Sequence, residues 1–309
     1  MSAKPVVKVG HLKITDHLIL GVTVDKLESG KETFERLDLQ TQAYRGWNPL
    51  AEDLRSGALD AAFILAPLAM ELYHAGVPIK LILQGHKSGS TLIKSKHANI
   101  QTLQDFRGKG LLIPHYLSAH HLLFDKLLRD SGLEVGAGKD IIFDVVAPSD
   151  IPEIIEWDEK GTVGGFIVAE PFGAQVVAAG LGEEFALYKD IWPQHPCCVL
   201  VVKQSLIDEH PEAVQELTTS LVHSGHFIEE HRHNGACRIG AKFLSQEEQV
   251  IRRVLTQPAD RVTMHELFPV IADLDYMQTY MTTKIQAMSA RIDLQKFVDT
   301  RFAEQAGAK

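Results

Sequence analysis

Ionisable and aromatic side chains recur where apolar, strand-like runs of this sequence give way to helix-like runs. In VGHLKITDHLILG (9–21), Asp16 and His17 lie at the joint between two runs that are otherwise apolar. Hydroxyl, carboxyl, imidazole and aromatic groups gathered at such joints are typical of a pocket that binds a small polar molecule. The candidate residues at this joint and at those after five later runs are Thr15, Asp16, His17, Trp47, Ala66, Pro67, His86, Ser88, His115, Tyr116, Glu170 and Phe172.

The elements that position these joints are predicted from the alternation of apolar runs with helical patterns. Strand-like runs separated by helices indicate an α/β fold with parallel sheets. After about residue 205 the pattern is mainly helical. The predicted strands cover 5–12, 38–44, 59–66, 78–86, 91–95, 110–115, 141–148, 163–171 and 197–204.

In open α/β sheets, ligands bind beyond the carboxyl ends of the strands. All the joints follow predicted strands, so we expect them to line one cleft. Ser118 joins the set because it is the predicted N-cap of a helix over 118–132. A helix N-terminus presents unpaired N–H groups and partial positive charge, which attract anions.

Several candidates also have a purely structural interpretation, which the sequence leaves open. Asp16 is equally suited to cap the helix that follows it. Trp47 is equally suited to core packing, and 85–90 to a plain linker between lobes. The charge of Glu170 complements a helix dipole.

Metal binding is not predicted, although the chain has 15 histidines. His115, His120 and His121 are close in sequence, but adjacent histidines point to different faces and His115 precedes the helix. Cys197 and Cys198 enter a strand and are interpreted as small buried apolar residues. The chain has no Cys-x-x-Cys pair, and its three cysteines do not form a disulfide framework. We therefore expect no metal and no cofactor.

Composition limits the class of protein. The 309 residues suggest about two domains, and a net charge of -9 disfavours nonspecific binding to nucleic acid or anionic lipid. No stretch reaches the roughly 20 apolar residues that span a bilayer. The N-terminus MSAKPVVKV lacks an apolar signal segment. We expect a periplasmic or membrane-associated protein if a leader was removed, and a cytoplasmic one if the chain is complete.

Several segments resemble one known family. EPFGAQVVAAGLGEEFALYKDIWPQHPCCVLVVKQSLIDEHPEAVQEL is similar to the corresponding segment of solute-binding proteins from the nitrate, bicarbonate, sulfonate and taurine class of ABC transporters. VGHLKITDHLILG resembles the first strand and ligand loop of that family, and LDAAFILAPLAM resembles its third strand. The resemblance covers roughly residues 5–245, and it is weaker over the last 60 or so residues.

The resemblance implies a two-lobed, periplasmic-binding-protein-like α/β fold with the ligand cleft between the lobes. We expect residues 1–88 and about 204–309 to form one lobe with a helical tail, and 89–203 to form the other. The implied function is the solute-binding component of an ABC importer, which clamps a small polar or anionic solute and delivers it to a permease. The chain has no GxxxxGK[ST] motif, so it is not the ATP-driven motor. We expect a non-catalytic monomer that binds no nucleic acid.

Two alternatives remain open from the sequence. One is a cytoplasmic enzyme of the same fold that resembles thiamine-pyrimidine synthases, although HPCCVL has only two cysteines where those enzymes have a richer motif. The other is a sensor or carrier without a signal segment. If Asp16 and Glu170 both face the ligand, that ligand needs positive charge, many hydrogen-bond donors or an accompanying divalent cation.

Overall fold

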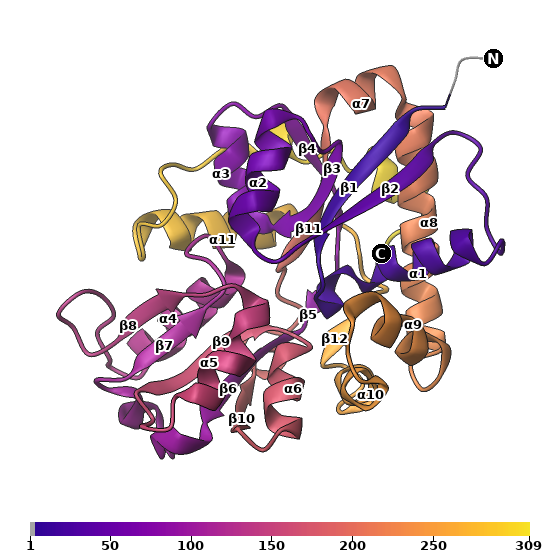
Figure 1. The fold of residues 1–309 in the computed structure, drawn as a ribbon. Helices are drawn as coiled ribbons and strands as arrows, with labels where there is room; N and C mark the ends of the chain where they lie inside the picture. Colours follow the sequence, from indigo (N-terminus) through magenta and orange to yellow (C-terminus); the bar gives the residue numbers. More distant parts are fainter. Residues whose placement is uncertain (1–3) are drawn as a thin grey trace.

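The computed structural model describes residues 4–309, and its strands form two mixed five-stranded sheets (Figure 1). In the first sheet the strand order is β2-β1-β3-β11-β4. β3 is buried along its whole length, whereas β2 is mostly exposed at the edge. The bounds are β1 (Val6–Leu12), β2 (Asp38–Tyr44), β3 (Ala61–Leu65), β4 (Ile79–Gln84) and β11 (Cys198–Lys203).

The second sheet has the order β10-β6-β9-β7-β8. β7 runs parallel to β8 and β9, while β6 runs antiparallel to β9 and β10. In the first sheet β11 is likewise antiparallel to both of its neighbours. The bounds are β6 (Ser90–Ser95), β7 (Gly110–Ile113), β8 (Ile142–Val145), β9 (Val163–Ala169) and β10 (Gly182–Leu187).

The expectation of parallel sheets is therefore wrong for β6 and β11. Each of these strands begins directly after the chain has passed from one sheet to the other. A helix that crosses over within one sheet returns the chain parallel to the previous strand. No crossover helix of this kind precedes β6 or β11. Each of the two strands enters its sheet from the other sheet and runs opposite to its neighbours.

The two passages between the sheets lie against each other. The first contains β5 (Lys87–Ser88), and the second contains His195 and Pro196. Ser88 N–H donates to the His195 carbonyl oxygen at 3.2 Å. The chain is already back in the first sheet at Cys198, because β11 pairs with β3 and β4. The expected boundary at 203–204 is therefore several residues too late.

Helices cover both sheets. The first half of the chain contributes α1 (Leu18–Glu28), α2 (Trp47–Ser56), α3 (Ala66–His74), α4 (Ala119–Asp130), α5 (Ile151–Trp157) and α6 (Phe172–Ala178). The second half contributes α7 (Gln204–Glu209), α8 (Pro211–Glu230), α9 (Gly235–Leu244), α10 (Glu248–Thr256), α11 (Ile271–Thr283), α12 (Leu294–Phe297) and α13 (Arg301–Gln305). Among the described residues, no helix combines the length and apolarity needed to cross a membrane.

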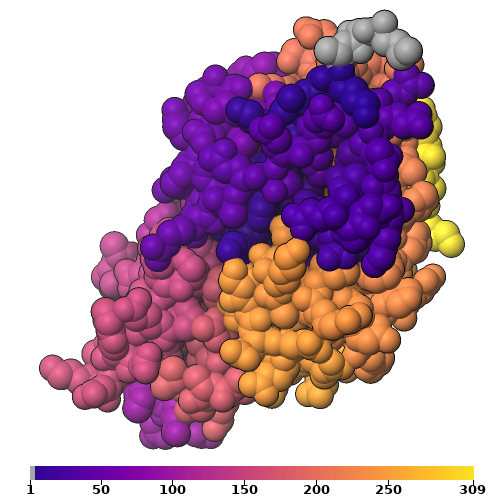
Figure 2. Space-filling view, turned by 45° about the vertical axis from the view of Figure 1, so that its right-hand side comes forward, coloured from indigo at the N-terminus to yellow at the C-terminus, as the bar shows by residue number. Residues whose placement is uncertain are grey.

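The C-terminal helices connect the two sheets rather than covering only the first. α9 packs on α1, α10 packs on α6, and α11 contacts both α3 and α4. β12 (Val262–Thr263) pairs with β5 at the passage between the sheets. Figure 2 shows the orange surface of α9 and α10 meeting the indigo N-terminal segments and the magenta second sheet region.

β11 is a buried interior strand of the first sheet, between β3 and β4, and this can be tested. Leu200 of β11 is fully buried between Phe63 and Leu83, whereas Ile142 on the edge strand β8 is 51% exposed. We expect Leu200→Ala to lower the free energy of unfolding by about 2–5 kcal/mol, because the cavity cannot close. Ile142→Ala is the matched control and should cost well under half as much in chemical denaturation. Equal costs would contradict a buried interior position for β11.

Candidate functional site

The turn after β1 is deeply buried. Thr15–His17 forms one turn of 3-10 helix between β1 and α1, and all three of its side chains are fully buried. The backbone of this turn approaches β11 closely, and Gly85 lies between the two segments. A Cβ atom at position 85 would lie 3.1 Å from the Asp16 carbonyl oxygen and 3.2 Å from that of Cys198. Glycine therefore permits the close approach on which the site depends.

A carboxylate, an imidazole and two thiols meet beside this turn. Asp16 Oδ2 lies 2.8 Å from His86 Nε2 and 3.6 Å from Cys198 Sγ. Asp16, His86, Cys197 and Cys198 each place one ligand-type atom so that all of these atoms lie within 4.8 Å of one another. His120, at the start of α4, lies 4.0 Å from Cys197 Sγ. We call these first four residues the Asp-His-Cys cluster.

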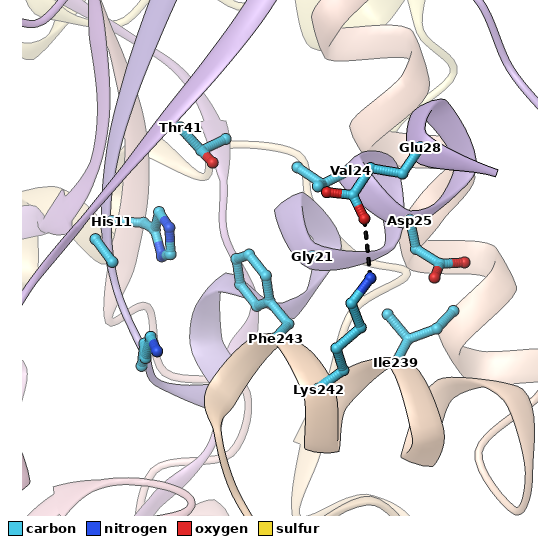
Figure 3. Close-up of a pocket in the computed structure, with 11 residues that line it drawn as sticks. His11, Gly21, Val24, Asp25, Glu28, Thr41, Ile239, Lys242 and Phe243 are labelled. Carbon is cyan, nitrogen blue, oxygen red and sulfur yellow. Dashed lines mark hydrogen bonds and ion pairs between the residues drawn. The ribbon is translucent and has the colours of Figure 1, made fainter. Parts of the chain in front are cut away.

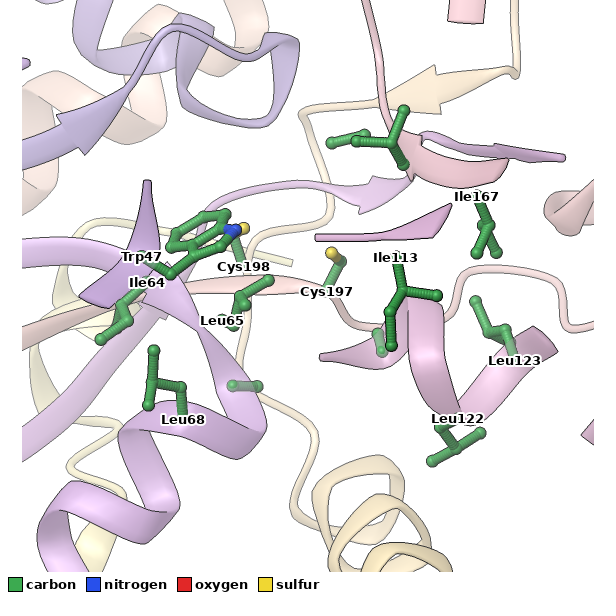
Figure 4. Packing of buried hydrophobic residues seen from close by; sticks show 14 of the residues in the cluster. Trp47, Ile64, Leu65, Leu68, Ile113, Leu122, Leu123, Ile167, Cys197 and Cys198 are labelled. Carbon is green, nitrogen blue, oxygen red and sulfur yellow. The ribbon is translucent and has the colours of Figure 1, made fainter. Parts of the chain in front are cut away.

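The cluster is enclosed by apolar side chains. All four of its members have no exposed surface. Figure 4 shows Cys197 and Cys198 between Trp47 and Leu65 on one side and Ile113 on the other. Such surroundings strengthen electrostatic interactions within the cluster and make any unpaired polar atom costly.

Burial and mutual contact set the charges in the cluster. Burial raises the pKa of the Asp16 carboxyl. At His86 burial opposes the charged form, but the Asp16 carboxylate outweighs it and raises the pKa of His86 to about 10. The Cys198 thiol and the His120 imidazole hold the pKa of Cys197 well below its usual range, whereas burial raises the pKa of Cys198. The 2.8 Å contact between Asp16 and His86 is thus a charge-assisted hydrogen bond, and Cys197 is the more acidic of the two thiols.

Several buried polar atoms around the cluster have no hydrogen-bond partner among residues 4–309. They come from the turn after β1, from the start of α2 and from the first passage between the sheets. Buried polar groups are nearly always hydrogen-bonded, so these atoms are groups that can donate to or accept from a bound molecule. The atoms are Thr15 Oγ1, Asp16 Oδ1, His17 Nε2, Trp47 Nε1 and His86 Nδ1.

Trp47 packs within the same region. It is 2% exposed at the start of α2, and its ring lies edge-on to that of His17, with centroids 6.0 Å apart. His17 also contacts Phe63, at 5.3 Å between centroids. The aromatic wall expected from the sequence is thus also part of the core, and its indole N–H is left to donate to a bound molecule.

Three contacts hold the two sheet regions together around the cluster. Thr15 N–H donates to the Glu170 carbonyl oxygen at 2.7 Å. His115 at the end of β7 contacts Asn48 Oδ1 in α2 at 3.0 Å. Arg45 forms an ion pair with Asp150 at 2.8 Å. Each contact joins a loop of the first sheet to a loop of the second.

Glu170 has a structural role instead of the ligand-facing one that the sequence suggested. Its Oε1 accepts from Thr91 Oγ1 at 3.1 Å and pairs with Arg261 at 2.8 Å. Its Oε2 accepts from Ala174 N–H at 2.9 Å, at the start of α6. Arg261 is 91 residues away in sequence, so no local pattern indicates it. The side chain is fully buried and its charge is compensated within the protein.

Tyr116 and Ser118 are also engaged elsewhere. Tyr116 is 51% exposed, and its hydroxyl donates to the Phe143 carbonyl oxygen at 3.3 Å, away from the cluster. Ser118 caps α4: its Oγ accepts from His121 N–H at 3.0 Å and donates to the His115 carbonyl oxygen at 2.6 Å. The cap still matters for the site, because it fixes the helix turn that carries His120 to Cys197.

The remaining candidates line the passages between the sheets. Ala66 and Pro67 begin α3, and Ala66 N–H donates to the Cys197 carbonyl oxygen at 2.9 Å. Ser88 is buried in β5 with a positive φ of 62°. Phe172 borders a cavity of about 370 Å³ between the ends of β1 and β2 and the loop at 148–149. These residues lie around the Asp-His-Cys cluster and are not members of it.

A second cavity lies at the outer side of the first sheet, where no candidate was expected (Figure 3). Its volume is about 280 Å³, and it lies between β1, β2, α1 and α9. His11 stacks on Phe243 at 4.8 Å, and Lys242 pairs with Glu28 at 2.9 Å across its edge. It borders the turn after β1, because the rings of His11 and His17 have centroids 6.4 Å apart.

The fold and the site together define the class of protein. Two mixed α/β sheets, joined by two adjacent passages with buried polar residues between them, make up the fold of periplasmic binding proteins. The periplasmic nitrate-binding protein NrtA from Synechocystis has this fold, with a TM-score of 0.86 at 15% identity over 98% of this chain and 88% of that one. The chain belongs to the NMT1-like family, whose pattern matches residues 2–244.

Two further similarities are closer in sequence. The ligand-binding component of an ABC-type import system from Staphylococcus aureus, solved with zinc bound, has a TM-score of 0.85 and 25% identity, over 98% of this chain and 99% of that one. The nitrate import ATP-binding protein NrtC of Synechocystis is 27% identical over 239 residues, which is 72% of this chain. The chain spans only 35% of the length of that relative.

The Glu170–Arg261 pair generates a stability prediction. Removing one partner of a buried ion pair leaves an uncompensated charge, which costs about 3–5 kcal/mol. We expect Arg261→Met to lose stability in this range, and Arg261→Met/Glu170→Gln to recover much of it. Arg253→Met is the matched control. Arg253 forms an ion pair with Glu184 but is 37% exposed, so the loss of stability should be about 1 kcal/mol or less. A loss at Arg261 no greater than this would refute the structural role of Glu170.

The buried histidines His11 and His115 lead us to predict that the free energy of unfolding falls in mild acid. Burial lowers the pKa of each to about 4, from an ordinary value of 6.5. At His115, Nδ1 accepts from Leu117 N–H at 2.9 Å, so a second ring proton has no room there. Between these pKa values the unfolded chain binds protons that the folded chain does not, so stability falls as the pH drops from about 6.5 towards 4.

The measurement is chemical denaturation at about pH 7 and about pH 5. His115→Gln should reduce the difference in unfolding free energy between the two conditions, since it removes one of the responsible groups. His74→Gln, at an exposed position at the end of α3, should leave the difference as it is. An unchanged difference in His115→Gln would show that this histidine is not held neutral by the fold.

Proposed function

We propose that this protein is the solute-binding component of an ABC importer and that it clamps a small polar or anionic solute between its two sheets. The observation that carries the proposal is the group of unpartnered polar atoms beside the Asp-His-Cys cluster, among the described residues, at the joint between the sheets. A solute there would supply the missing hydrogen bonds. The three contacts between the sheet regions would then form when the clamp closes on it.

The charge of the site favours a solute with oxygen acceptors. Glu170 is neutralised by Arg261, and Asp16 shares a proton with His86. Both buried carboxylates therefore have a partner that reduces their repulsion of an anion. The indole N–H of Trp47 and the hydroxyl of Thr15 are available as donors within the part of the chain that the structure describes. Nitrate, bicarbonate and alkanesulfonates all present acceptor oxygens, and relatives named for nitrate fit this chemistry.

The partners follow from this role. We propose that the closed form docks on a membrane permease on the outer side of the membrane and releases its solute there. The chain contains no P-loop, so ATP hydrolysis would belong to another subunit.

A non-catalytic role fits the geometry better than the enzyme alternative. In a nucleophilic cysteine enzyme, one nitrogen of the base contacts the thiol and the other contacts the orienting carboxylate. Here His86 uses Nε2 for Asp16, and its Nδ1 has no partner among residues 4–309. His120 is 4.0 Å from Cys197. Neither imidazole bridges Asp16 to a thiol in the way that general-base catalysis requires.

The test combines solute titration with small-angle scattering. Nitrate, bicarbonate and an alkanesulfonate are titrated separately, and at least one should bind and reduce the radius of gyration. Trp47→Phe keeps an aromatic ring but removes the indole N–H, so we expect the Kd to rise roughly 3–10-fold, the cost of one hydrogen bond. Tyr116→Phe is the control, because its hydroxyl contacts only Phe143 outside the site.

The proposed function fails if none of the three solutes binds or changes the radius of gyration. It also fails in its placement of the site if Trp47→Phe and Tyr116→Phe bind the active solute as tightly as the parent does.

A further inference from the structure

The Asp-His-Cys cluster has the composition of a metal centre. We propose that Asp16, His86, Cys197 and Cys198 bind one Zn²⁺ ion at the joint between the two sheets. The proposal does not depend on the importer role, because it rests on the side chains of the cluster alone.

The spacing of the ligand atoms is close to that of a tetrahedral site. Zinc bonds of about 2.0 Å to nitrogen or oxygen and about 2.3 Å to sulfur place neighbouring ligand atoms roughly 3.3–3.8 Å apart. The Cys198 Sγ to Asp16 Oδ2 distance is 3.6 Å, and all four atoms lie within 4.8 Å of one another. The Asp16 to His86 separation of 2.8 Å has to widen by about half an ångström, since a metal replaces the shared proton.

The chemistry of the donor set selects the metal. Two thiolates, one imidazole and one carboxylate suit Zn²⁺, which takes four ligands of mixed sulfur, nitrogen and oxygen type. Mg²⁺ and Ca²⁺ require six or more oxygen ligands, and the cluster offers oxygen only from Asp16. A hard divalent cation is therefore a poor match for this position.

A divalent cation would also compensate the charge of the buried donor groups. All four residues of the cluster are fully buried. A cation at the centre would stabilise the Asp16 carboxylate and two thiolates at once, where water is excluded. Its arrival releases the proton shared by Asp16 and His86 and any protons on the two thiols, and no electrons are transferred.

The position of the ligands would tie metal binding to the order of the two passages. Asp16 follows β1 of the first sheet, His86 begins the first passage, and Cys197 and Cys198 end the second passage. A single ion would therefore hold both passages and the turn after β1 in one arrangement. His120 of the second sheet region contacts Cys197 and would stand beside the coordinated sulfur.

The experiment uses Co²⁺ as a spectroscopic probe and Zn²⁺ as its competitor. The full chain is stripped with a chelator, kept reduced, and titrated with Co²⁺. We expect one Co²⁺ per chain, with thiolate-to-metal charge-transfer absorption and the strong visible bands of tetrahedral cobalt. Zn²⁺ should displace it stoichiometrically. Surface histidines also bind Co²⁺, but they cannot give charge transfer from sulfur.

Cysteine variants identify the ligands. Cys198→Ser should abolish the charge-transfer band or weaken it strongly, and should lower Zn²⁺ affinity on the order of tenfold or more. Cys237→Ser is the matched control. Cys237 is also buried, but it lies in α9 and its thiol donates to the Arg232 carbonyl oxygen at 2.8 Å. This variant should keep the band and the affinity of the parent.

Two outcomes overturn the proposal. The first is a parent protein whose Co²⁺ spectrum shows no charge transfer from sulfur. The second is loss of the band in Cys237→Ser. These measurements remain decisive if Cys198→Ser fails to fold, because they need only the parent and the control. The outcome is independent of the solute titration, so either proposal can fail alone.

Discussion

The hydrogen-bonded pair of Asp16 and His86 is the contact on which the arrangement of the two sheets depends. Removing a carboxylate and an imidazole from water is costly, and their mutual contact at 2.8 Å compensates only one atom of each. The pair nevertheless lies where β1, both passages and the turn before α1 come together. A structure optimised for stability alone would fill this position with apolar side chains. The presence of charged groups here is best explained by binding.

The neighbouring elements are arranged so that this pair can be enclosed. Gly85 lets the turn at Thr15–His17 approach β11, and the Thr15–Glu170 backbone contact then closes the second sheet over it. Ser118 caps α4 and so directs His120 towards Cys197. These contacts are local and depend on small or capping residues. Together they bring side chains from distant parts of the chain to one buried centre.

Much of the fold and part of the site could be predicted from the sequence. The nine predicted strands and α4 lie close to their observed bounds, because buried runs and an N-cap have strong local signals, whereas the partly exposed edge strand β10 was not predicted. Asp16 and His86 are predicted as candidates because they follow strands. Cys197 and Cys198, which the structure places beside them, are not predicted as candidates because they precede a strand. β11 is antiparallel to β3, so its start lies at the same edge as the end of β3, and Cys198 pairs with Leu65. A rule based on parallel strands inspects only the residues that follow them.

Glu170 shows the other limit of local reasoning, and it changes the expected ligand. On sequence alone Asp16 and Glu170 count as two negative charges in one cleft, which excludes a bare anion. Arg261 pairs with Glu170 from 91 residues away, through a contact that only the folded chain creates. With Glu170 compensated and Asp16 sharing a proton with His86, the centre of the molecule is close to neutral. A centre without excess negative charge can accept an anion through its free donors. Replacing the shared proton and the two thiol protons by one Zn²⁺ would instead leave the cluster with one net negative charge, so the metal would favour a solute that also brings hydrogen-bond donors.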